Sequence, residues 1–126
     1  MEADKILLVD DDQSISEILE FNLRSEGFDV TTVYSAAEAL ELEIEQFDLI
    51  LLDVMMGGIS GYKLAEQLRN DNYSTPIIFL TAKDTENDML TAFSVGGDDY
   101  ISKPFSIKEV IARVKAVLKR SRTLPQ

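Results

Sequence analysis

Near its N-terminus the chain reads KILLVDDD, residues 5–12, where an unbroken apolar run meets three consecutive aspartates. Two similar apolar runs follow, LILL at 49–52 and IIFL at 77–80. A short apolar run between polar residues is typical of a strand that is buried on both faces of a parallel sheet. These runs therefore predict strands at 6–9, 49–52 and 77–80.

Helical patterns alternate with the apolar runs. Two further strands are predicted at 29–34 and 100–101, and two helices at 61–70 and 85–95. Two more segments carry apolar residues at helical spacing, Ile15, Ile18, Leu19 and Leu23 in the first and Val110, Ile111, Val114, Val117 and Leu118 in the second. This alternation, repeated five times, predicts an α/β fold with an open, mostly parallel sheet and helices on both faces.

Polar residues predict where several helices begin. Ser14, Ser35 and Ser106 each stand three residues before a glutamate, which is the spacing of a capping box. Asp12 is also expected to help to cap the first helix, because the helix dipole favours a negative charge there.

Composition and charge exclude several kinds of function. The chain has 126 residues, the size of one domain, and it has no Cys and no His. Disulfides, thiolate nucleophiles, Ser-His-Asp catalysis and imidazole metal ligands are therefore excluded, and any metal must bind through oxygen. Residues 1–102 hold 5 basic and 22 acidic residues, too acidic a body to bind nucleic acid through its phosphates. No apolar run could span a membrane, so we expect a soluble, cytoplasmic protein without a membrane partner.

Polar side chains follow the predicted strands at their carboxyl ends. Asp10 and Asp11 follow the first strand, Asp53 the third, Thr81 the fourth and Lys103 the fifth. Ligands bind at this edge of an open α/β sheet, so these side chains are expected to converge. Clustered carboxylates repel one another unless a cation is present, and Mg²⁺ prefers such oxygen ligands. With an ammonium beside it, the site suits a phosphoryl group, for which a carboxylate can be the nucleophile.

The chain resembles the receiver domain of bacterial two-component response regulators over residues 5–120. The resemblance is carried by KILLVDDD (5–12), DLILLDVMMGGISGYKL (48–64), PIIFLTA (76–82) and GGDDYISKPF (96–105). It implies a flavodoxin-like, five-stranded parallel sheet with the strand order 2-1-3-4-5. It also implies a phosphoacceptor switch and not an enzyme, able at most to promote its own phosphorylation from small donors and its own slow dephosphorylation.

The resemblance implies a role for each polar residue around the acceptor. Asp53 would accept a phosphoryl group from the phosphohistidine of a partner sensor histidine kinase, and Lys103 would pair with a phosphoryl oxygen. Mg²⁺, for which Mn²⁺ could substitute, would be held by Asp10, Asp11 and Asp53 and by the backbone carbonyl of Met55.

A conformational switch is implied at the fourth and fifth strands. Thr81 would move to hydrogen-bond the phosphate, and Tyr100 would turn inward behind it. These new contacts would bias a two-state element formed by the helix at 85–95 and the strand at 100–101. The Lys103-Pro104 peptide bond is implied to be cis.

The segment GGDDYISKPFSIKEVIARVKAVLKR, residues 96–120, is most similar to the subfamily of transcription factors that carry a winged-helix DNA-binding domain. Phosphorylation there promotes a symmetric homodimer through the helix at 85–95, the strand at 100–101 and the last helix. Asp99 would pair with Arg113 and Asp98 with Arg120 across the interface, with Glu109 facing a basic residue. On this interpretation residues 1–120 form the receiver, and 121–126 begin a linker to an absent C-terminal domain through which alone the protein would contact DNA.

Two positions depart from the family pattern. Gly57 stands where the family usually has Pro, and glycine loosens this loop beside Asp53. Met89 stands where the basic partner of Glu109 would lie, so the third bridge lacks its cation. Exposed ion pairs contribute only about 0–1 kcal/mol each, so dimerisation does not depend on this one.

Two alternatives remain open at this point. The start ILLVDDDQS also fits a dehalogenase-like Mg²⁺ phosphatase, with Asp10 as nucleophile and Asp12 as acid and base. That interpretation leaves Asp53 unexplained and needs a larger domain. The other alternative is a binding module that switches without phosphate, against which the complete set of polar residues argues.

Overall fold

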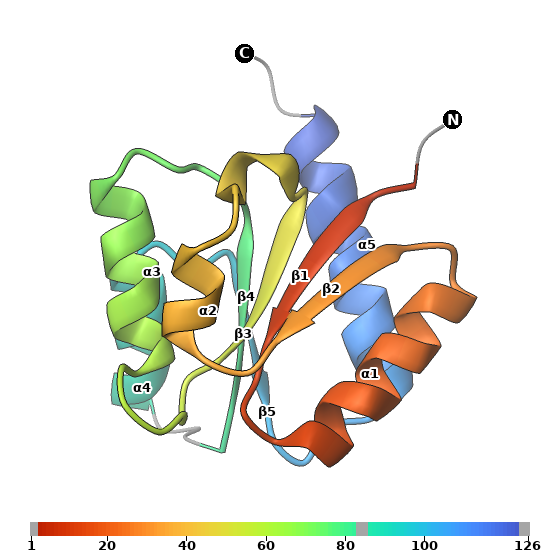
Figure 1. The fold of residues 1–126 in the computed structure, drawn as a ribbon, viewed down its shortest axis with the longest axis horizontal. Coiled ribbons are helices and arrows are strands. Elements are labelled where there is room, and N and C mark those ends of the chain that lie inside the picture. Colours follow the sequence, from red (N-terminus) through yellow and green to blue (C-terminus); the bar gives the residue numbers. More distant parts are fainter. Residues whose placement is uncertain (1–2, 83–85, 124–126) are drawn as a thin grey trace.

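A single five-stranded parallel sheet forms the centre of the computed structural model, which describes residues 3–82 and 86–123 (Figure 1). The strands are β1 (Lys5–Val9), β2 (Asp29–Val33), β3 (Leu49–Asp53), β4 (Ile77–Thr81) and β5 (Asp99–Ser102). They lie in the order β2-β1-β3-β4-β5, and every neighbouring pair is parallel. The predicted fold class and strand order are confirmed.

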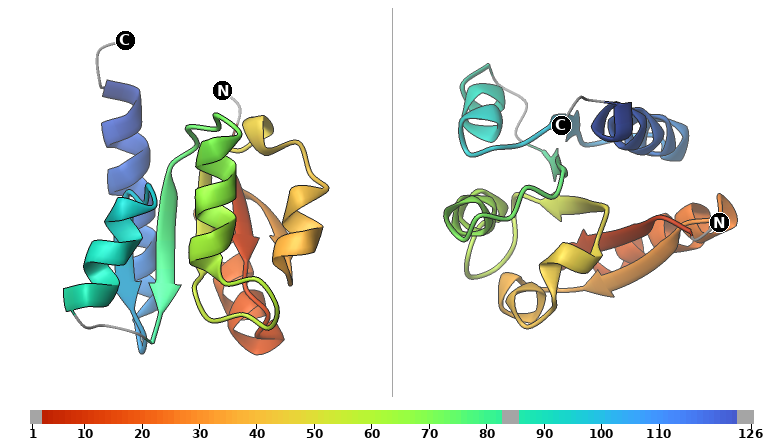
Figure 2. Two further views of the ribbon diagram at one scale, coloured as in Figure 1. Left: turned by 90° about the vertical axis from the view of Figure 1, so that its left-hand side faces the viewer. Right: turned by 90° about the horizontal axis from the view of Figure 1, so that it is seen from above.

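Helices cover both faces of the sheet (Figure 2). They are α1 (Gln13–Ser25), α2 (Ala36–Leu40), α3 (Gly61–Asn70), α4 (Glu86–Ser94) and α5 (Ile107–Thr123), with a short 3₁₀ turn, η1 (Ile44–Gln46). Side chains of α1 and α5 pack on one face, and those of α2, α3 and α4 pack on the other. This distribution follows from right-handed crossover connections between parallel strands.

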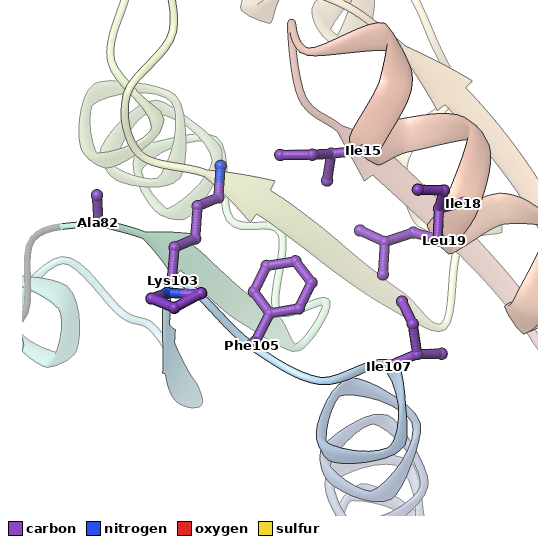
Figure 3. A pocket seen from close by; sticks show the side chains of 8 residues that line it. Ile15, Ile18, Leu19, Ala82, Lys103, Phe105 and Ile107 are labelled. Atoms are coloured by element: carbon purple, nitrogen blue, oxygen red, sulfur yellow. The ribbon is translucent and has the colours of Figure 1, made fainter.

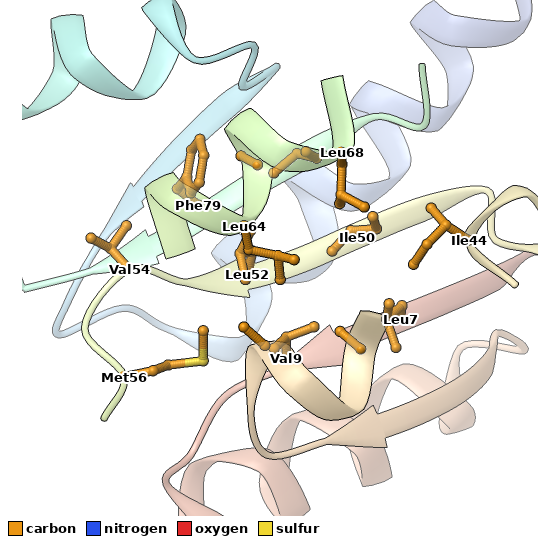
Figure 4. Packing of buried hydrophobic residues seen from close by; sticks show 14 of the residues in the cluster. Leu7, Val9, Ile44, Ile50, Leu52, Val54, Met56, Leu64, Leu68 and Phe79 are labelled. Carbon is orange, nitrogen blue, oxygen red and sulfur yellow. The ribbon is translucent and has the colours of Figure 1, made fainter. Parts of the chain in front are cut away.

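Alternate residues of the central strands supply two separate cores. Leu7, Ile50 and Phe79 point toward α2, α3 and α4 (Figure 4), whereas Ile6 and Leu51 face α1 and α5. All five residues of β3 are buried, as are all five of β4. A strand covered on both faces needs apolar residues at odd and even positions alike, which is why these segments read as unbroken apolar runs.

Strand register brings the carboxyl ends to one level. Val9 pairs with Leu52, so the next residues of the two strands, Asp10 and Asp53, are neighbours. Leu80 pairs with Asp53 on the other side. The edge at which β1, β3 and β4 end therefore gathers the polar residues that follow them.

Helix starts were predicted correctly at two of the three serines. Ser35 and Ser106 accept hydrogen bonds from the backbone N–H groups of Glu38 and Glu109, at 3.1 and 3.0 Å. The prediction that Ser14 caps the first helix is wrong, because α1 already begins at Gln13. Its cap is Asp12, whose carboxylate accepts from the N–H of Ile15 at 3.1 Å.

Element ends differ slightly from the predicted ones. β2 stops at Val33, and α5 runs to Thr123, so residues 121–123, predicted to begin a linker, continue the helix. Thr85 and residues 124–126 lie outside the described residues. Ile18, predicted to belong to the apolar stripe of α1, is 53% exposed. Within the described segments, none of the helices combines the length and the apolar character that crossing a membrane requires.

Candidate functional site

Three carboxylates meet where β1 and β3 end. Oxygen atoms of Asp10, Asp11 and Asp53 lie within 4.8 Å of one another. Asp10 and Asp53 are buried, with 0% and 2% of their surface exposed, whereas Asp11 is exposed. Thr81 is fully buried at the end of the adjacent strand, β4. The structure thus brings together the acidic residues that the sequence places at the strand ends.

Among the residues that the structure describes, the ammonium group of Lys103 alone enters this cluster. Its Nζ atom lies 3.4 Å from Oδ1 of Asp53 and 3.7 Å from Oδ2 of Asp10. The backbone N–H of Lys103 donates to the carbonyl of Thr81 at 2.7 Å, which fixes the start of the side chain beside β4. The peptide bond to Pro104 is cis, as the resemblance implies. Within residues 3–82 and 86–123, one cation therefore faces three carboxylates, which leaves an excess of negative charge.

This excess charge has a direct effect on Asp53. Burial and, to a smaller extent, the negative charge of Asp10 raise the pKa of its carboxyl from 3.8 to about 6. Lys103 and the N–H of Met55 act in the opposite direction but do not compensate. Ionising Asp53 therefore costs more free energy than ionising an ordinary carboxyl, and a bound cation would offset that cost.

The donor set fits a hard divalent cation. Oδ1 of Asp10 accepts the N–H of Asp12 at 2.9 Å, but no hydrogen-bond donor among the described residues reaches Oδ2 of this buried side chain. A buried carboxylate oxygen without a donor is costly, and a cation would satisfy it. Met55 follows in the same loop as Asp53 and donates its N–H to Oδ1 of Asp53 at 3.2 Å. Oxygen-only ligands on a partly open edge suit Mg²⁺.

Glycines shape the loop that follows the phosphoacceptor candidate. A Cβ atom on Gly61 would lie 2.3 Å from the carbonyl oxygen of Asp53, so only glycine lets α3 begin this close to the end of β3. Gly57 donates its N–H to Oδ2 of Asp11 at 3.1 Å. Sequence reasoning singled out Gly57 only as a source of flexibility and missed this hydrogen bond.

A pair of tyrosines links the site to α4. Tyr100 on β5 is only 7% exposed, so the ring already points inward in this structure. Tyr62 on α3 packs edge-on against Phe79, with the two ring centroids 5.1 Å apart. The hydroxyl of Tyr62 donates a hydrogen bond to the backbone carbonyl of Asp88 in α4 at 3.1 Å. Burial raises the pKa of Tyr62 to about 12, with a smaller contribution from Tyr100. Sequence reasoning missed Tyr62, because an aromatic residue at a helix start is ordinary.

The residues predicted for a dimer interface lie together on β5 and α5, but several already contact one another within the chain. Nη1 of Arg113 lies 3.0 Å from Oδ1 of Asp99, and its Nε lies 3.3 Å from Glu109. Arg120 donates to the backbone carbonyl of Asp98 at 3.2 Å. Pairing across an interface would therefore replace or extend contacts that exist in one protomer.

Arg69 was not singled out from the sequence, yet it ties three segments together. It donates to the carbonyls of Tyr73, Thr75 and Gly96 at 2.7–3.2 Å, and it lies 3.3 Å from the carboxylate of Asp98. Asp98 in turn accepts the N–H of Ile77 at 2.9 Å. This clamp joins the end of α3 to the loops that precede β4 and β5.

An apolar cavity of about 600 Å³ opens beside Lys103. Figure 3 shows Lys103 reaching toward the end of β3, while Phe105 and Ile107 face Ile15 and Leu19 of α1 across the cavity. Next to it on α1, Ile18 and Phe21 expose 53% and 71% of their surface. The cavity, with Ile18 in its wall, thus places apolar surface next to Lys103.

Comparisons with known proteins agree with one another. The response regulator receiver domain family matches residues 6–115. The receiver domain of the Francisella response regulator 1452 is 38% identical, with a TM-score of 0.88 over 94% of this chain and 98% of that one. DrrB from Thermotoga maritima, an OmpR/PhoB homolog, is 34% identical, with a TM-score of 0.87 over 94% of this chain and 54% of that one. The BeF3 activated receiver domain of DrrB is 33% identical, with a TM-score of 0.85 over 93% and 98%.

Proposed function

This chain belongs to the response regulator receiver family, and from that membership we propose that Asp53 is its phosphoacceptor and a sensor histidine kinase its phosphodonor. Receiver domains are phosphorylation switches. The observation that carries the assignment to Asp53 is the buried carboxylate cluster, in which Asp53 ends β3 and has the ammonium of Lys103 at 3.4 Å.

The proposed chemistry is transfer of a phosphoryl group to a carboxylate. A carboxylate oxygen of Asp53 forms the new O–P bond while the N–P bond to the imidazole of the kinase breaks, and the imidazole leaves with its electron pair and takes up a proton. Lys103 is placed to pair with a phosphoryl oxygen, where negative charge must be stabilised. The pKa of Asp53, although raised to about 6, is still below 7, so the ionised, nucleophilic form is available at neutral pH.

We further propose that Mg²⁺, or Mn²⁺ in its place, binds at Asp10, Asp11 and Asp53 and at the backbone carbonyl of Met55. Bound there, the ion would neutralise charge on the phosphoryl oxygens. The buried Oδ2 of Asp10, which has no donor among the described residues, supports this assignment. Asp10 and Asp11 would then hold the ion, while Lys103 lies within 3.7 Å of Asp10 and 3.4 Å of Asp53 and adds a second positive charge to the site.

The proposed switch couples the acceptor to α4 through Thr81 and Tyr100. Thr81 would donate its hydroxyl to the phosphoryl group, and the inward position of Tyr100 would be stabilised behind it. The hydrogen bond from Tyr62 to Asp88 supports a mechanical link, because any movement of the first turn of α4 must break or stretch it. The two states would differ in contacts at the phosphoryl group, which is what a ligand-driven population shift requires.

The kinase would approach over α1. A phosphodonor must reach Asp53 from the open edge, and α1 exposes the apolar side chains of Phe21 and of Ile18, which lies at the cavity beside Lys103. Apolar contacts on this scale can orient a partner before transfer.

The output we propose is transcription control through a phosphorylation-dependent homodimer formed by α4, β5 and α5. Leu90 and Phe93 expose 60% and 48% of their surface on α4, beside the charged residues of β5 and α5. An exposed apolar patch with a polar rim has the composition of an interface. The likeness to DrrB, of whose length the chain matches 54%, supports a receiver that includes all of α5 and is followed by a linker and a DNA-binding domain.

The phosphatase alternative is set aside. Asp12, which would be its acid and base, uses its carboxylate to cap α1 and does not belong to the carboxylate cluster. The family match places the chain among receiver domains instead. A binding module that switches without phosphate would gain no phosphoryl adduct in the experiment that follows.

The direct test is intact-mass spectrometry after incubation with acetyl phosphate and Mg²⁺. Wild type is expected to gain one phosphoryl adduct, and Asp53→Asn none, because the amide is not a nucleophile. Asp48→Asn, at the other end of β3, is the matched control and should gain the same adduct as wild type. An adduct that persists in Asp53→Asn, or steady phosphate release that depends on Asp10 without any adduct on wild type, would overturn the proposal.

Dimerisation is tested separately by analytical ultracentrifugation with and without beryllofluoride. Wild type is expected to shift toward a dimer, and Leu90→Glu to remain monomeric while still gaining the phosphoryl adduct. If wild type gains the adduct but its sedimentation does not change, the acceptor assignment stands and the dimer proposal fails.

A further inference from the structure

The three carboxylates of the cluster are held by three backbone N–H groups. Asp10 accepts from Asp12 and Asp53 accepts from Met55, each two residues further along its own turn. Asp11 accepts from Gly57, 46 residues away. Only this third bond, among the three, joins the loop after β1 to the loop after β3.

We propose that the backbone N–H of Gly57 positions the Asp11 carboxylate for cation binding, so that the loop carrying the phosphoacceptor also orients a ligand from the neighbouring strand. This inference rests on the proposed function. Gly57 acts here as a positioning residue, because it touches Asp11 and not the reacting atoms.

The physical argument starts from exposure. Asp10 and Asp53 are fixed by burial, but Asp11 is exposed, and nothing in its own turn holds the side chain in the way that Asp12 and Met55 hold the other two. The N···O distance of 3.1 Å to Gly57 fixes Oδ2 and leaves Oδ1 available. Orienting a ligand before binding removes part of the entropy that binding would otherwise cost.

Position 57 allows a clean test of the N–H group. Gly57 does not have a left-handed backbone conformation, and a Cβ atom there would meet no atom within 4 Å. Alanine should therefore keep both the loop and the N–H. Proline lacks the N–H, so comparison of Gly57→Ala with Gly57→Pro isolates the hydrogen bond from the loss of glycine flexibility.

The experiment measures Mg²⁺ affinity by isothermal titration calorimetry for wild type, both variants and Asp11→Ala. Loss of one hydrogen bond to a carboxylate is expected to weaken Mg²⁺ binding about three- to tenfold in Gly57→Pro. Gly57→Ala is expected to match wild type within about twofold, and Asp11→Ala to bind most weakly. Equal affinity of Gly57→Pro and Gly57→Ala, or tighter binding by Gly57→Pro, would overturn the inference.

A second measurement keeps the inference testable if Gly57→Pro does not fold. When ¹H–¹⁵N spectra of Asp11→Ala and wild type are compared, the amide proton of Gly57 should lie further upfield in the variant, and its shift should exceed that of Gly58. An unchanged Gly57 resonance would contradict the hydrogen bond. Failure of the proposed function looks different: wild type would then bind no Mg²⁺, or Asp11→Ala would bind it as tightly as wild type.

Discussion

The strand β3 has an aspartate at each end, and the two have opposite environments. Asp48, just before the strand, accepts the N–H of Lys5 at 2.8 Å. Asp98, just before β5, likewise accepts the N–H of Ile77 and faces Arg69. Asp53, at the other end of β3, is buried beside Asp10, and in the described part of the chain Lys103 is its only counter-ion. The amino edge of the sheet thus satisfies its acidic residues, whereas the carboxyl edge leaves them in excess.

The difference separates two uses of one residue type. At the amino edge, an aspartate closes the end of a strand by accepting the N–H of its neighbour, and it stabilises the fold. At the carboxyl edge, burial and repulsion make the aspartates unfavourable until a cation or a phosphoryl group arrives. Substitutions at the two edges should therefore change stability in opposite directions.

The largest expected effect is at the amino edge. Arg69→Met removes the hydrogen bonds to three backbone carbonyls and to Asp98 and should lower the free energy of unfolding by about 3 kcal/mol. Urea denaturation measures this loss. Lys63→Met, on the same helix, removes an exposed pair with Glu66 and should change it by about 0.5 kcal/mol or less. A similar loss of stability in both variants would contradict the stabilising role of the Arg69 hydrogen bonds.

At the carboxyl edge, removal of a charge should stabilise the protein. Asp53→Asn relieves the burial and repulsion that raise the pKa of Asp53 and should raise the free energy of unfolding by about 2 kcal/mol without divalent cations at a pH of about 7.5. Urea denaturation in EDTA is the measurement. The matched control, Asp48→Asn, should leave stability unchanged or lower it. Destabilisation by Asp53→Asn would contradict the contrast between the edges.

The same contrast should depend on pH. The folded state holds a proton on Asp53 up to a pH of about 6, while the unfolded state releases it near 3.8. The contribution of Asp53 to stability is therefore fully present below a pH of about 4 and is lost as the pH rises through about 6. Measured between these limits, the advantage of Asp53→Asn over wild type should shrink toward zero as the pH falls. A constant difference would show that ionisation is not its cause.

The smallest effect concerns the cation. Mg²⁺ at ten times its dissociation constant should raise the free energy of unfolding of wild type by about 1.4 kcal/mol. Thermal unfolding with and without Mg²⁺ measures the gain in stability. Protein in EDTA, without divalent cations, is the reference. Asp10→Asn should show little of the gain, because it loses a buried ligand. An equal gain in that variant would place the ion elsewhere.

The main elements and the acceptor cluster could be predicted from the sequence because both depend on local patterns. Buried strands read as apolar runs, and α3 was predicted with the bounds that the structure has, Gly61–Asn70. Asp10, Asp53 and Lys103 could be brought together in advance because parallel strands end at one edge.

Contacts between distant segments could not be predicted in this way. Arg69 reaches Gly96 across 27 residues, Tyr62 reaches Asp88 across 26, and Gly57 reaches Asp11 across 46. Each contact depends on a backbone atom of one partner, which carries no signature in the sequence. The prediction of a cap at Ser14 was wrong for a related reason: two polar residues, Asp12 and Ser14, stand near the helix start, and the sequence pattern does not show that Asp12 is the cap.

The link from Tyr62 to α4 has a consequence for how such proteins diverge. Its acceptor is the main-chain oxygen of Asp88, an atom that every residue supplies. Side chains on the outer side of α4, Met89 and Leu90 among them, can therefore change through evolution without breaking the joint that holds the helix. Paralogues within one cell could thus keep a common internal mechanism while each acquires a surface that rejects the partners of the others.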